Sequence, residues 1–300
     1  MWCYRNSEPI SHIAWSDRAV QYGDGCFSTV RMCENVWQLK NRHIARLQQA
    51  MQVLKLQADL QHVQHSLQLL QQHCPSTASG LNGVLKILIS RGEGARGYAM
   101  PDHAADVYVC YYPQQHQPQQ NQPQQNQPQQ HQSQQNHPQH TASSLYSEIE
   151  SGLLQQQLGI SMPQLVGLKT LNRLEQVLLK NEAQQQRWPE ALVCDVQQRV
   201  VEGVSSNCFI LLPPGWVTPD LAYNGIWGVM RAEILARMQQ NGISCEVREV
   251  YAHELNHMQA LFYCNALQPM QAVSHFHGRV LDVALTQQLY QTLDLDHIDE

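Results

Sequence analysis

Lys169 stands in an apolar stretch of the sequence, where a charged side chain is costly to bury. The run reads QLVGLKTL, so that Val166, Gly167 and Leu168 directly precede the lysine. Burial lowers the pKa of an amine, because desolvation penalises its charged form. A neutral amine at physiological pH is a nucleophile that can form a Schiff base and then act as a base. The alternative is that Lys169 extends from the end of a strand into solvent.

A second charged residue, Glu202, interrupts the strand-like run RVVEGV. A buried carboxylate needs a permanent partner, and a protonated pyridine nitrogen would be one. The alternative is a glutamate in a turn, placed just before Gly203. The two readings differ in whether the side chain faces a ligand or the solvent.

The segment YNGIWGVMRAEIL places glycines directly before an expected helix. Free backbone N–H groups at a helix N-terminus suit a phosphate, although many helices begin after a glycine. A buried lysine, a buried glutamate and an anion-binding helix start are together the parts of a pyridoxal phosphate site.

Seven motifs occur here in an order that resembles fold-type IV pyridoxal phosphate enzymes. They are SDRAVQYGDGCFSTVR, HIARL, SRGEGARGY, GLKTLNRLEQV, VEGVSSNCF, GVMR and CNALQPM, and they cover nearly the whole chain outside a Gln/Pro-rich tract. Within this class, their spacing and the wording KTLNRLEQV resemble the aminodeoxychorismate lyases. The resemblance implies a two-domain α+β architecture like that of D-amino-acid aminotransferases, with pyridoxal 5′-phosphate as the cofactor.

The resemblance assigns cofactor contacts to residues at matching positions. Lys169 would bind the cofactor covalently through its amine, and Glu202 would keep the pyridine nitrogen protonated. The cofactor phosphate would be held by the Arg46 side chain, by the backbone N–H groups of Val229 and Met230, and by Asn265.

Three further residues are expected at the substrate, namely Arg96, Ser28 and Thr29. Arg96 falls where D-amino-acid aminotransferases of this class bind the substrate carboxylate. Aminotransferases usually have glutamate directly after the aromatic residue of the G-D-G-x-[FY] motif, whereas Ser28 and Thr29 follow it here, as in the lyases. The alternative is that these are two small residues facing a sheet neighbour. Leu174 replaces the tyrosine that branched-chain aminotransferases have five residues beyond the lysine.

The implied reaction converts 4-amino-4-deoxychorismate, a small-molecule substrate, to 4-aminobenzoate and pyruvate in folate synthesis. The resemblance also implies a homodimer and a functional link to aminodeoxychorismate synthase. One alternative is a D-amino-acid or branched-chain aminotransferase of the same fold. Another is a non-enzymatic interaction protein built around the Gln-rich tract, and the joint presence of Lys169, Glu202, Arg46 and Asn265 counts against it.

The composition excludes several other classes of function. With 300 residues, a net charge of -6 and a pI of about 6.2, the chain has no basic field to attract nucleic acid or anionic membrane. Its apolar runs are too short to span a bilayer, and the first residues do not read as a secretion signal. Nine scattered cysteines without a C-x-x-C pair favour reduced thiols in the cytoplasm over a disulfide framework or a zinc site.

Residues 113–144 differ in composition from the rest of the chain. A pentad close to P-Q-Q-[HN]-Q repeats from Pro113 to His140, without leucine, isoleucine, valine or aromatic residues. Such a segment cannot bury enough apolar surface to offset its ordering entropy, so a disordered connection is expected. Its histidines are irregularly spaced on a flexible tract and predict no metal site. The tract separates an N-terminal α+β domain, residues 1–112, from a C-terminal domain, residues 145–300, that carries the lysine.

Hydrophobic periodicity predicts the elements that must position these residues. Residues 41–57, 172–186 and 228–242 have helical spacing. The first helix has an apolar face formed by Ile44, Leu47, Met51 and Leu54, and the second has one formed by Leu171, Leu174, Val177 and Leu178.

Five β-rich runs complete the pattern, at residues 83–90, 105–112, 190–196, 199–204 and 207–212. The last three are expected to be strands of one antiparallel sheet joined by short turns. Lys169 is expected where a strand turns into the helix that begins near Asn172. Because strands and helices are mixed without strict alternation, the fold class is predicted to be α+β.

Overall fold

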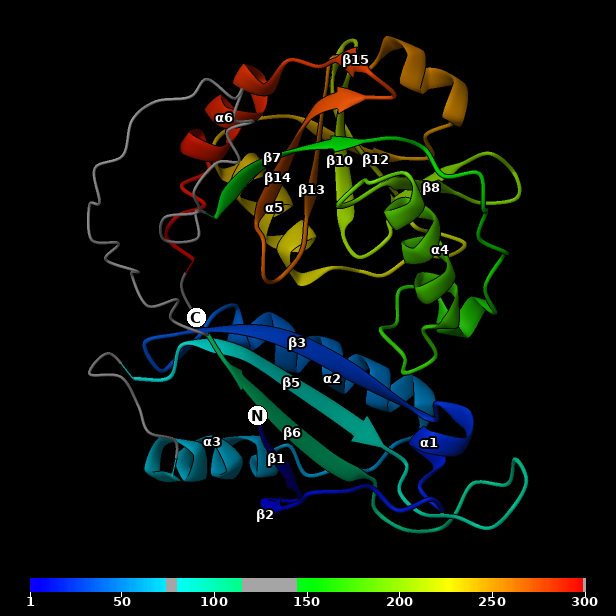
Figure 1. Cartoon of the computed structure of the whole chain (residues 1–300), viewed down its shortest axis with the longest axis vertical. Helices are drawn as coiled ribbons and strands as arrows, with labels where there is room; N and C mark the ends of the chain where they lie inside the picture. Colours follow the sequence, from blue (N-terminus) through cyan, green and yellow to red (C-terminus); the bar gives the residue numbers. More distant parts are fainter. Residues whose placement is uncertain (74–79, 115–144, 299–300) are drawn as a thin grey trace, which may run out of the picture.

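The computed structural model describes residues 1–73, 80–114 and 145–298, and shows two sheet-based halves packed against each other (Figure 1). Most of the predicted Gln/Pro-rich connection, from residue 115 to 144, lies outside the described residues. No helix in the described parts is long and apolar enough to cross a membrane. Both halves combine helices with largely antiparallel strands, which confirms the predicted α+β class.

The first half contains a six-stranded sheet in the order β2-β1-β6-β5-β3-β4, in which every neighbouring pair is antiparallel. The predicted strand at residues 83–90 is confirmed to the residue. The strands are β1 (Trp2–Arg5), β2 (Glu8–Pro9), β3 (Gly25–Cys33), β4 (Val36–Trp37), β5 (Gly83–Ser90) and β6 (Asp106–Pro113).

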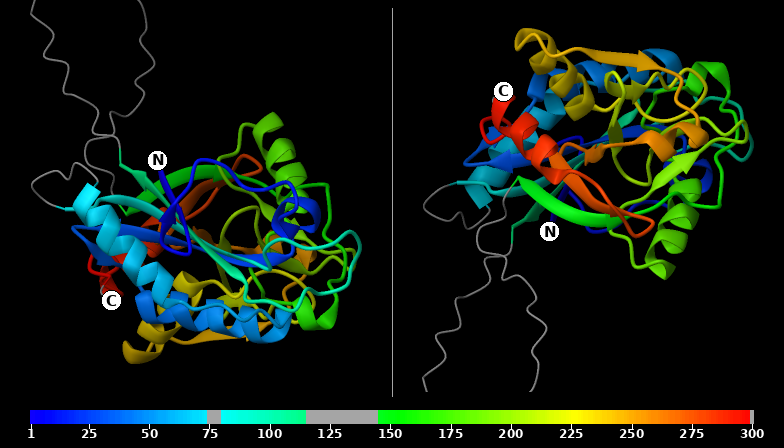
Figure 2. Two further views of the ribbon diagram at one scale, coloured as in Figure 1. Left: turned by 90° about the horizontal axis from the view of Figure 1, so that it is seen from below. Right: turned by 90° about the horizontal axis from the view of Figure 1, so that it is seen from above.

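Two helices cover one face of this sheet (Figure 2). Helix α2 (Lys40–Leu54) packs on β3, and α3 (Gln61–His73) packs on β6. Side chains alternate between the faces of a strand, and the helix-facing set is fully buried. Its largest members include Leu85 and Ile87. The apolar face predicted for α2 is confirmed, since Leu47 is buried and its three companions pack against the same core. The short helix α1 (Arg18–Tyr22) precedes β3.

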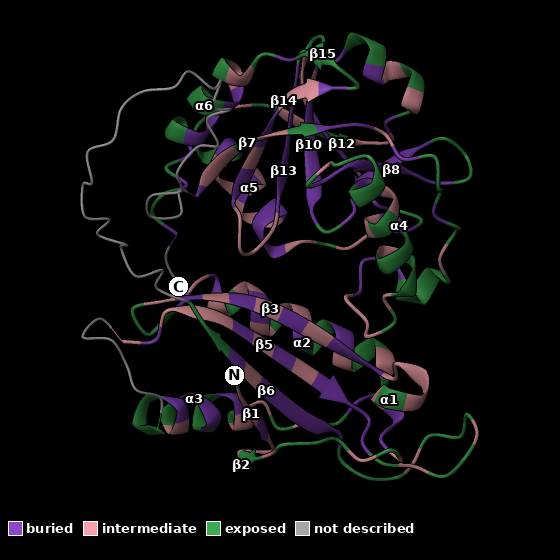
Figure 3. Cartoon of the chain, in the orientation of Figure 1, coloured by how far each residue is buried: buried purple, intermediate pink, exposed green. Residues whose placement is uncertain are grey.

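The second half is organised around a mixed seven-stranded sheet. Six strands follow the order β12-β11-β10-β13-β14-β15, and β7 pairs in parallel with β14. In Figure 3 the central strands β10 and β13 are mostly buried. The rings of Phe209 on β10 and Phe262 on β13 are stacked, with their centroids 4.9 Å apart. The strands are β7 (Tyr146–Ser151), β10 (Asn207–Leu212), β11 (Gly215–Pro219), β12 (Cys245–Arg248), β13 (Ala260–Cys264), β14 (Met270–Phe276) and β15 (Arg279–Val280).

One sequence expectation about these strands is wrong. The runs at 190–196 and 199–204 form a separate two-stranded sheet of β8 (Leu192–Cys194) and β9 (Val200–Gly203), whereas the run at 207–212 enters the large sheet. The chain changes sheets in the turn after Gly203. Hydrophobic patterning identifies strands but does not say which sheet each one joins.

Three helices belong to the second half, namely α4 (Leu174–Gln185), α5 (Val229–Gln240) and α6 (Val283–Thr292). The apolar face predicted for α4 is not buried within the chain. Leu174 is 72% exposed, Val177 61% and Leu178 52%, while Leu179 and Ala183 form the buried side. The 3₁₀ helices η1 (Pro163–Leu165) and η2 (Ala252–His257) complete the elements.

Candidate active site

Lys169 is reached through a tight main-chain path rather than along a regular strand. Helix η1 ends four residues before the lysine and no strand of the described chain leads into it, which corrects the expected strand, and α4 begins five residues after the lysine. Gly167 adopts φ +78° and donates its N–H to the Gly225 carbonyl at 3.1 Å. A Cβ at Gly167 would lie 2.1 Å from the Trp227 ring. Only glycine combines this conformation with this close approach, so Gly167 fixes the entry into the lysine segment.

The lysine segment is hydrogen-bonded to strand β3 of the first half. The Phe27 N–H donates to the Lys169 carbonyl at 2.9 Å, and the Leu171 N–H donates to the Gly25 carbonyl at 3.0 Å. The Lys169 Nζ lies 4.5 Å from the centroid of the Phe27 ring. The amine is therefore held at the junction of the two halves.

The environment of Lys169 favours its neutral form. Burial lowers the pKa of Lys169 to about 7, and the positive charges of Arg46 and Arg173 act in the same direction. Glu202 opposes this shift, but its effect is smaller. A substantial fraction of the amine is therefore unprotonated near neutral pH, in line with the first of the two interpretations of the sequence. The alternative of a lysine extended into solvent is wrong.

Glu202 lies on β9 and is 5% exposed. Its Oε2 accepts hydrogen bonds from the Asn207 Nδ2 at 3.0 Å and from the Ile226 N–H at 3.1 Å. Burial raises the pKa of Glu202 to about 7, against the lowering effect of the Ile226 hydrogen bond and of Lys169. Within the described chain no cationic side chain comes within 4.0 Å of this carboxylate. Glu202 thus suits a ligand that brings its own positive charge.

Arg46, on α2, is held by a small buried network. Its NH2 group donates to the Ser28 Oγ at 2.5 Å, and Ser28 lies 2.7 Å from the Nδ1 of His43. Burial and the nearby cations hold the pKa of His43 well below its usual range, so His43 is neutral and can accept from Ser28. The Arg46 Nε is buried without a hydrogen-bond partner among the described residues. Burial lowers the pKa of Arg46 to about 10, so the guanidinium stays cationic at neutral pH.

The start of α5 offers further donors. Gly228 is the N-cap and provides no side-chain cap for the first N–H groups of the helix. A Cβ at Gly228 would lie 1.9 Å from the Asn207 Oδ1, so glycine is needed to keep both groups in place. Nearby, the Asn265 Oδ1 accepts from the N–H groups of Leu267 and Gln268, which leaves its Nδ2 as the remaining donor.

These groups face one cavity of about 380 Å³. It is bounded by an amine, a carboxylate, a guanidinium and an uncapped helix start. The predicted site residues that line it are Thr29, Arg46, Lys169, Glu202, Val229, Met230 and Asn265.

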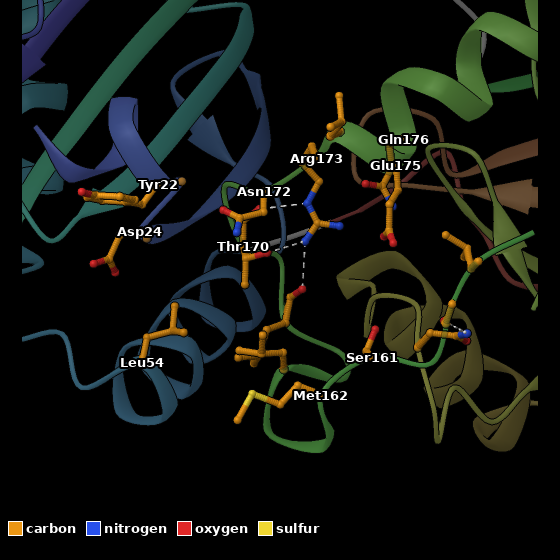
Figure 4. Close-up of a pocket in the computed structure, with 18 of the residues that line it drawn as sticks. Tyr22, Asp24, Leu54, Ser161, Met162, Thr170, Asn172, Arg173, Glu175 and Gln176 are labelled. Atoms are coloured by element: carbon orange, nitrogen blue, oxygen red, sulfur yellow. Dashed lines mark hydrogen bonds between the residues drawn. The ribbon is translucent and has the colours of Figure 1, made fainter. Parts of the chain in front are cut away.

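A second, larger cavity of about 750 Å³ adjoins the first (Figure 4). Arg173, Gln176 and Glu202 line both cavities and so form their common wall. The Arg173 guanidinium donates to the carbonyls of Thr170 and Leu168, at 2.8 and 3.1 Å, and has no acidic partner within 4.0 Å in the described chain. The Gln176 Oε1 is buried without a partner there.

Two predicted substrate residues are not brought to these cavities. Ser28 is fully buried, and its hydroxyl contacts His43 and Arg46 on helix α2 rather than the sheet neighbour that its alternative interpretation named. Arg96 is exposed in a loop and lines neither cavity, although Tyr98 in the same loop lines the larger one.

The residues of the cavity walls that sequence reasoning missed include Phe27, Asn207 and Arg173. Each stands inside a quoted motif, so the motif wording could have pointed to them. Asn207 in VEGVSSNCF is five residues after Glu202 and bonds to it, which a pairing of polar residues across the β9–β10 turn could have suggested.

Comparisons with known proteins agree on one family. A family model described as Amino-transferase class IV matches residues 25–276. The chain is 28% identical to an aminodeoxychorismate lyase of Vibrio harveyi over 90% of this chain and 89% of that protein. It is 23% identical to a D-alanine aminotransferase of Bacillus licheniformis, covering 88% and 83%. A crystal structure of 4-amino-4-deoxychorismate lyase from Pseudomonas aeruginosa superposes with a TM-score of 0.79 at 30% identity, covering 98% of both chains.

Proposed function

Since the chain belongs to the class IV aminotransferase family, we propose that it converts 4-amino-4-deoxychorismate to 4-aminobenzoate and pyruvate. The family and the resemblance make it a pyridoxal phosphate-dependent enzyme of fold-type IV. The observation that carries the choice of reaction is the similarity to two lyases of this substrate, at 28% and 30% identity, over nearly the whole chain.

The residues around the smaller cavity fit the cofactor. The buried, unpartnered Nε of Arg46 and the uncapped start of α5 suit a phosphate, and Glu202, without a cation of its own, suits a protonated ring nitrogen. When bound, pyridoxal phosphate supplies an electron sink for the substrate carbon that bears the amine. Lys169 would bind the cofactor carbonyl, and Asn265 would donate to the phosphate.

Lys169 would also move the proton in the reaction. Once the substrate amine displaces it, the neutral lysine can take the proton from the substrate carbon that bears this amine. Its pKa of about 7 in the cavity leaves a substantial fraction of the amine unprotonated near neutral pH. Departure of pyruvate leaves an aromatic ring, so the protein mainly needs to orient the substrate and transfer protons.

Arg173 is proposed to orient a carboxylate of the substrate. It lines both cavities, is cationic, and bonds to main-chain and Thr170 oxygens rather than to an acidic side chain. Thr29 lines the same cavity as Lys169 and is kept as a substrate contact in this proposal. Ser28 would position the Arg46 side chain, which is hydrogen-bonded to it. Arg96 would contact the substrate after a movement of its exposed loop.

Arg46→Gln is expected to weaken cofactor binding by roughly ten- to a hundred-fold, because it removes a charged donor to the phosphate. Titration of cofactor-free protein with pyridoxal phosphate, followed by absorbance, measures the effect. Arg42→Gln is the matched control on the same helix, since Arg42 pairs with Glu233 and does not line the cavity. Equal affinities for the two variants would contradict the assignment of Arg46.

The alternative function is transamination of D-amino or branched-chain amino acids within the same fold. We expect aminodeoxychorismate to yield 4-aminobenzoate and pyruvate rapidly without any 2-oxo acid. D-Alanine has no comparable leaving group and should turn over only slowly, even with 2-oxoglutarate. Parallel assays of both substrates, with and without 2-oxoglutarate, distinguish the two activities. An inert aminodeoxychorismate, together with an amino acid that turns over only with 2-oxoglutarate, would identify an aminotransferase.

The wider setting of the proposal follows the same resemblance. The product would enter folate synthesis, downstream of an aminodeoxychorismate synthase, in the cytoplasm. A homodimer is expected, and the exposed apolar side chains of α4 offer a surface that a second copy could cover. Residues 1–112 and 145–300 are proposed as separate domains, in keeping with hydrophobic clusters that each draw on one of the two ranges apart from Leu168 and Leu39.

A further inference from the structure

Cys3 and Cys110 lie directly opposite each other on neighbouring antiparallel strands. The register of β1 and β6 pairs Cys3 with Cys110, and the two Sγ atoms are 2.9 Å apart. Both residues are partly exposed, so a small oxidant can reach them. They are far apart in sequence, separated by 107 positions, and therefore meet only in the folded sheet.

The hydrogen-bonding pattern of β1 explains why these two sulfurs come so close. The Cys3 carbonyl accepts from the Ile10 N–H, toward the β2 side, whereas the Asn6 N–H donates to the Val107 carbonyl in β6. Main-chain groups of successive residues point to opposite sides of a strand, so Cys3 and Cys110 form a non-hydrogen-bonded pair. Such pairs have Cα atoms about 4.5 Å apart, which is inside the range that a disulfide spans.

The other described cysteines lack this arrangement. Cys208 and Cys264 lie on the neighbouring strands β10 and β13, but their register partners are Tyr263 and Asn207. An offset of one residue turns their side chains to opposite faces of the sheet. In the described chain no other two cysteines are paired in register.

We propose that Cys3 and Cys110 are a site of reversible oxidation, forming a disulfide when the protein meets a peroxide. The Cys3 sulfur attacks one peroxide oxygen, and the O–O bond breaks to give a sulfenic acid and water. The Cys110 sulfur then attacks the Cys3 sulfur and displaces the second oxygen, which leaves as water with the Cys110 proton. Two thiols lose two electrons in total, and one peroxide is reduced to two waters.

The order of these steps is assigned from the surroundings of Cys110. Burial and the hydrogen bond from Cys3 raise the pKa of Cys110 to about 12, which keeps Cys110 protonated at neutral pH. The proposal therefore assigns the attack on the peroxide to Cys3, which leaves Cys110 as the sulfur that closes the link. Strand β6, which carries Cys110, is two strands away from β3 in the sheet. Oxidation is therefore expected to link the N-terminal strand β1 covalently to β6 without changing the cofactor cavity.

The test treats the full-length protein with hydrogen peroxide, followed by intact mass measurement and peptide mapping without reductant. We expect loss of the mass of two hydrogen atoms and a linked pair of peptides carrying Cys3 and Cys110, both reversed by dithiothreitol. The oxidised protein should melt roughly 5–15 °C higher, because the link closes a long loop in the unfolded chain.

Cys3→Ser and Cys110→Ser should each abolish the link and the rise in melting temperature. Cys33→Ser is the matched control, because Cys33 is a partly exposed cysteine on β3 whose register partner is Val36. It should form the link as the unaltered protein does. Thiols that stay free, Cys3 that is oxidised without becoming linked, or a link that survives in Cys3→Ser would each overturn the proposal.

Discussion

Lys169→Ala protein is expected to lose the yellow absorbance near roughly 410–420 nm that a lysine-bound pyridoxal phosphate gives, and with it the enzymatic activity. The loss should reach about three orders of magnitude or more, because one amine serves both as the covalent anchor and as the base. The fold should remain intact, since alanine removes an amine whose burial was itself unfavourable. Absorbance, turnover and circular dichroism measure these three effects.

Borohydride reduction gives a more specific measurement of the attachment. It makes the bond between cofactor and protein permanent only where an amine holds the cofactor covalently. Lys86→Ala is a suitable control, since the Lys86 Nζ lies 5.0 Å from the same Phe27 ring but does not line the cavity. Lys86→Ala protein should keep the reducible link, whereas Lys169→Ala protein should not. A reducible link in Lys169→Ala protein would show that another amine anchors the cofactor. In unaltered protein, cofactor capture should become faster as the pH rises through about 7, because the pKa of Lys169 lies there.

Glu202→Gln is expected to keep the cofactor and lose roughly a hundred-fold or more in turnover. The amide oxygen can still accept from Asn207 and Ile226, as the Oε2 does now, so the packing is preserved. The amide then presents its NH2 group to the ring nitrogen, which disfavours a proton on that nitrogen. Without that proton, the ring withdraws electrons poorly from the substrate carbon.

A second variant separates charge from packing at this position. Glu202→Asp retains a carboxylate and should recover part of the rate, although its side chain is shorter. The absorbance of each variant shows whether the cofactor is bound, and turnover is compared only among loaded proteins. Near-normal turnover of loaded Glu202→Gln protein would remove Glu202 from the chemistry.

Local signals in the sequence predicted the elements and much of the site. Alternation and helical spacing are properties of a few consecutive residues, so β5 was predicted to the residue, α5 within two residues and α2 within three. The resemblance supplied nine residues from seven separate motifs, and seven of the nine line one cavity.

The remaining features depend on tertiary contacts that spacing does not encode. The apolar stripe of α4 is helical as predicted, but its orientation is set by what packs beside it, and the stripe faces outward. Ser28 sits in the predicted motif, yet its hydroxyl turns toward His43 and Arg46 because α2 crosses that face of β3. The split of β9 and β10 between two sheets depends in the same way on long-range pairing.

Because the lysine segment is hydrogen-bonded to β3, the substitutions that one half tolerates depend on the sequence of the other half. Lys169 belongs to the second half by sequence, but its carbonyl and the Leu171 N–H are paired with Phe27 and Gly25 in the first. A substitution that shifts either segment moves the reactive amine relative to Glu202, even if each half still folds. Recombination between relatives at the 113–144 connection would therefore produce active chimeras only when both parents share this pairing. The 113–144 connection is the place where the sequence most readily tolerates a crossover. The pairing of the lysine segment with β3 nevertheless limits which crossovers there keep the active site intact.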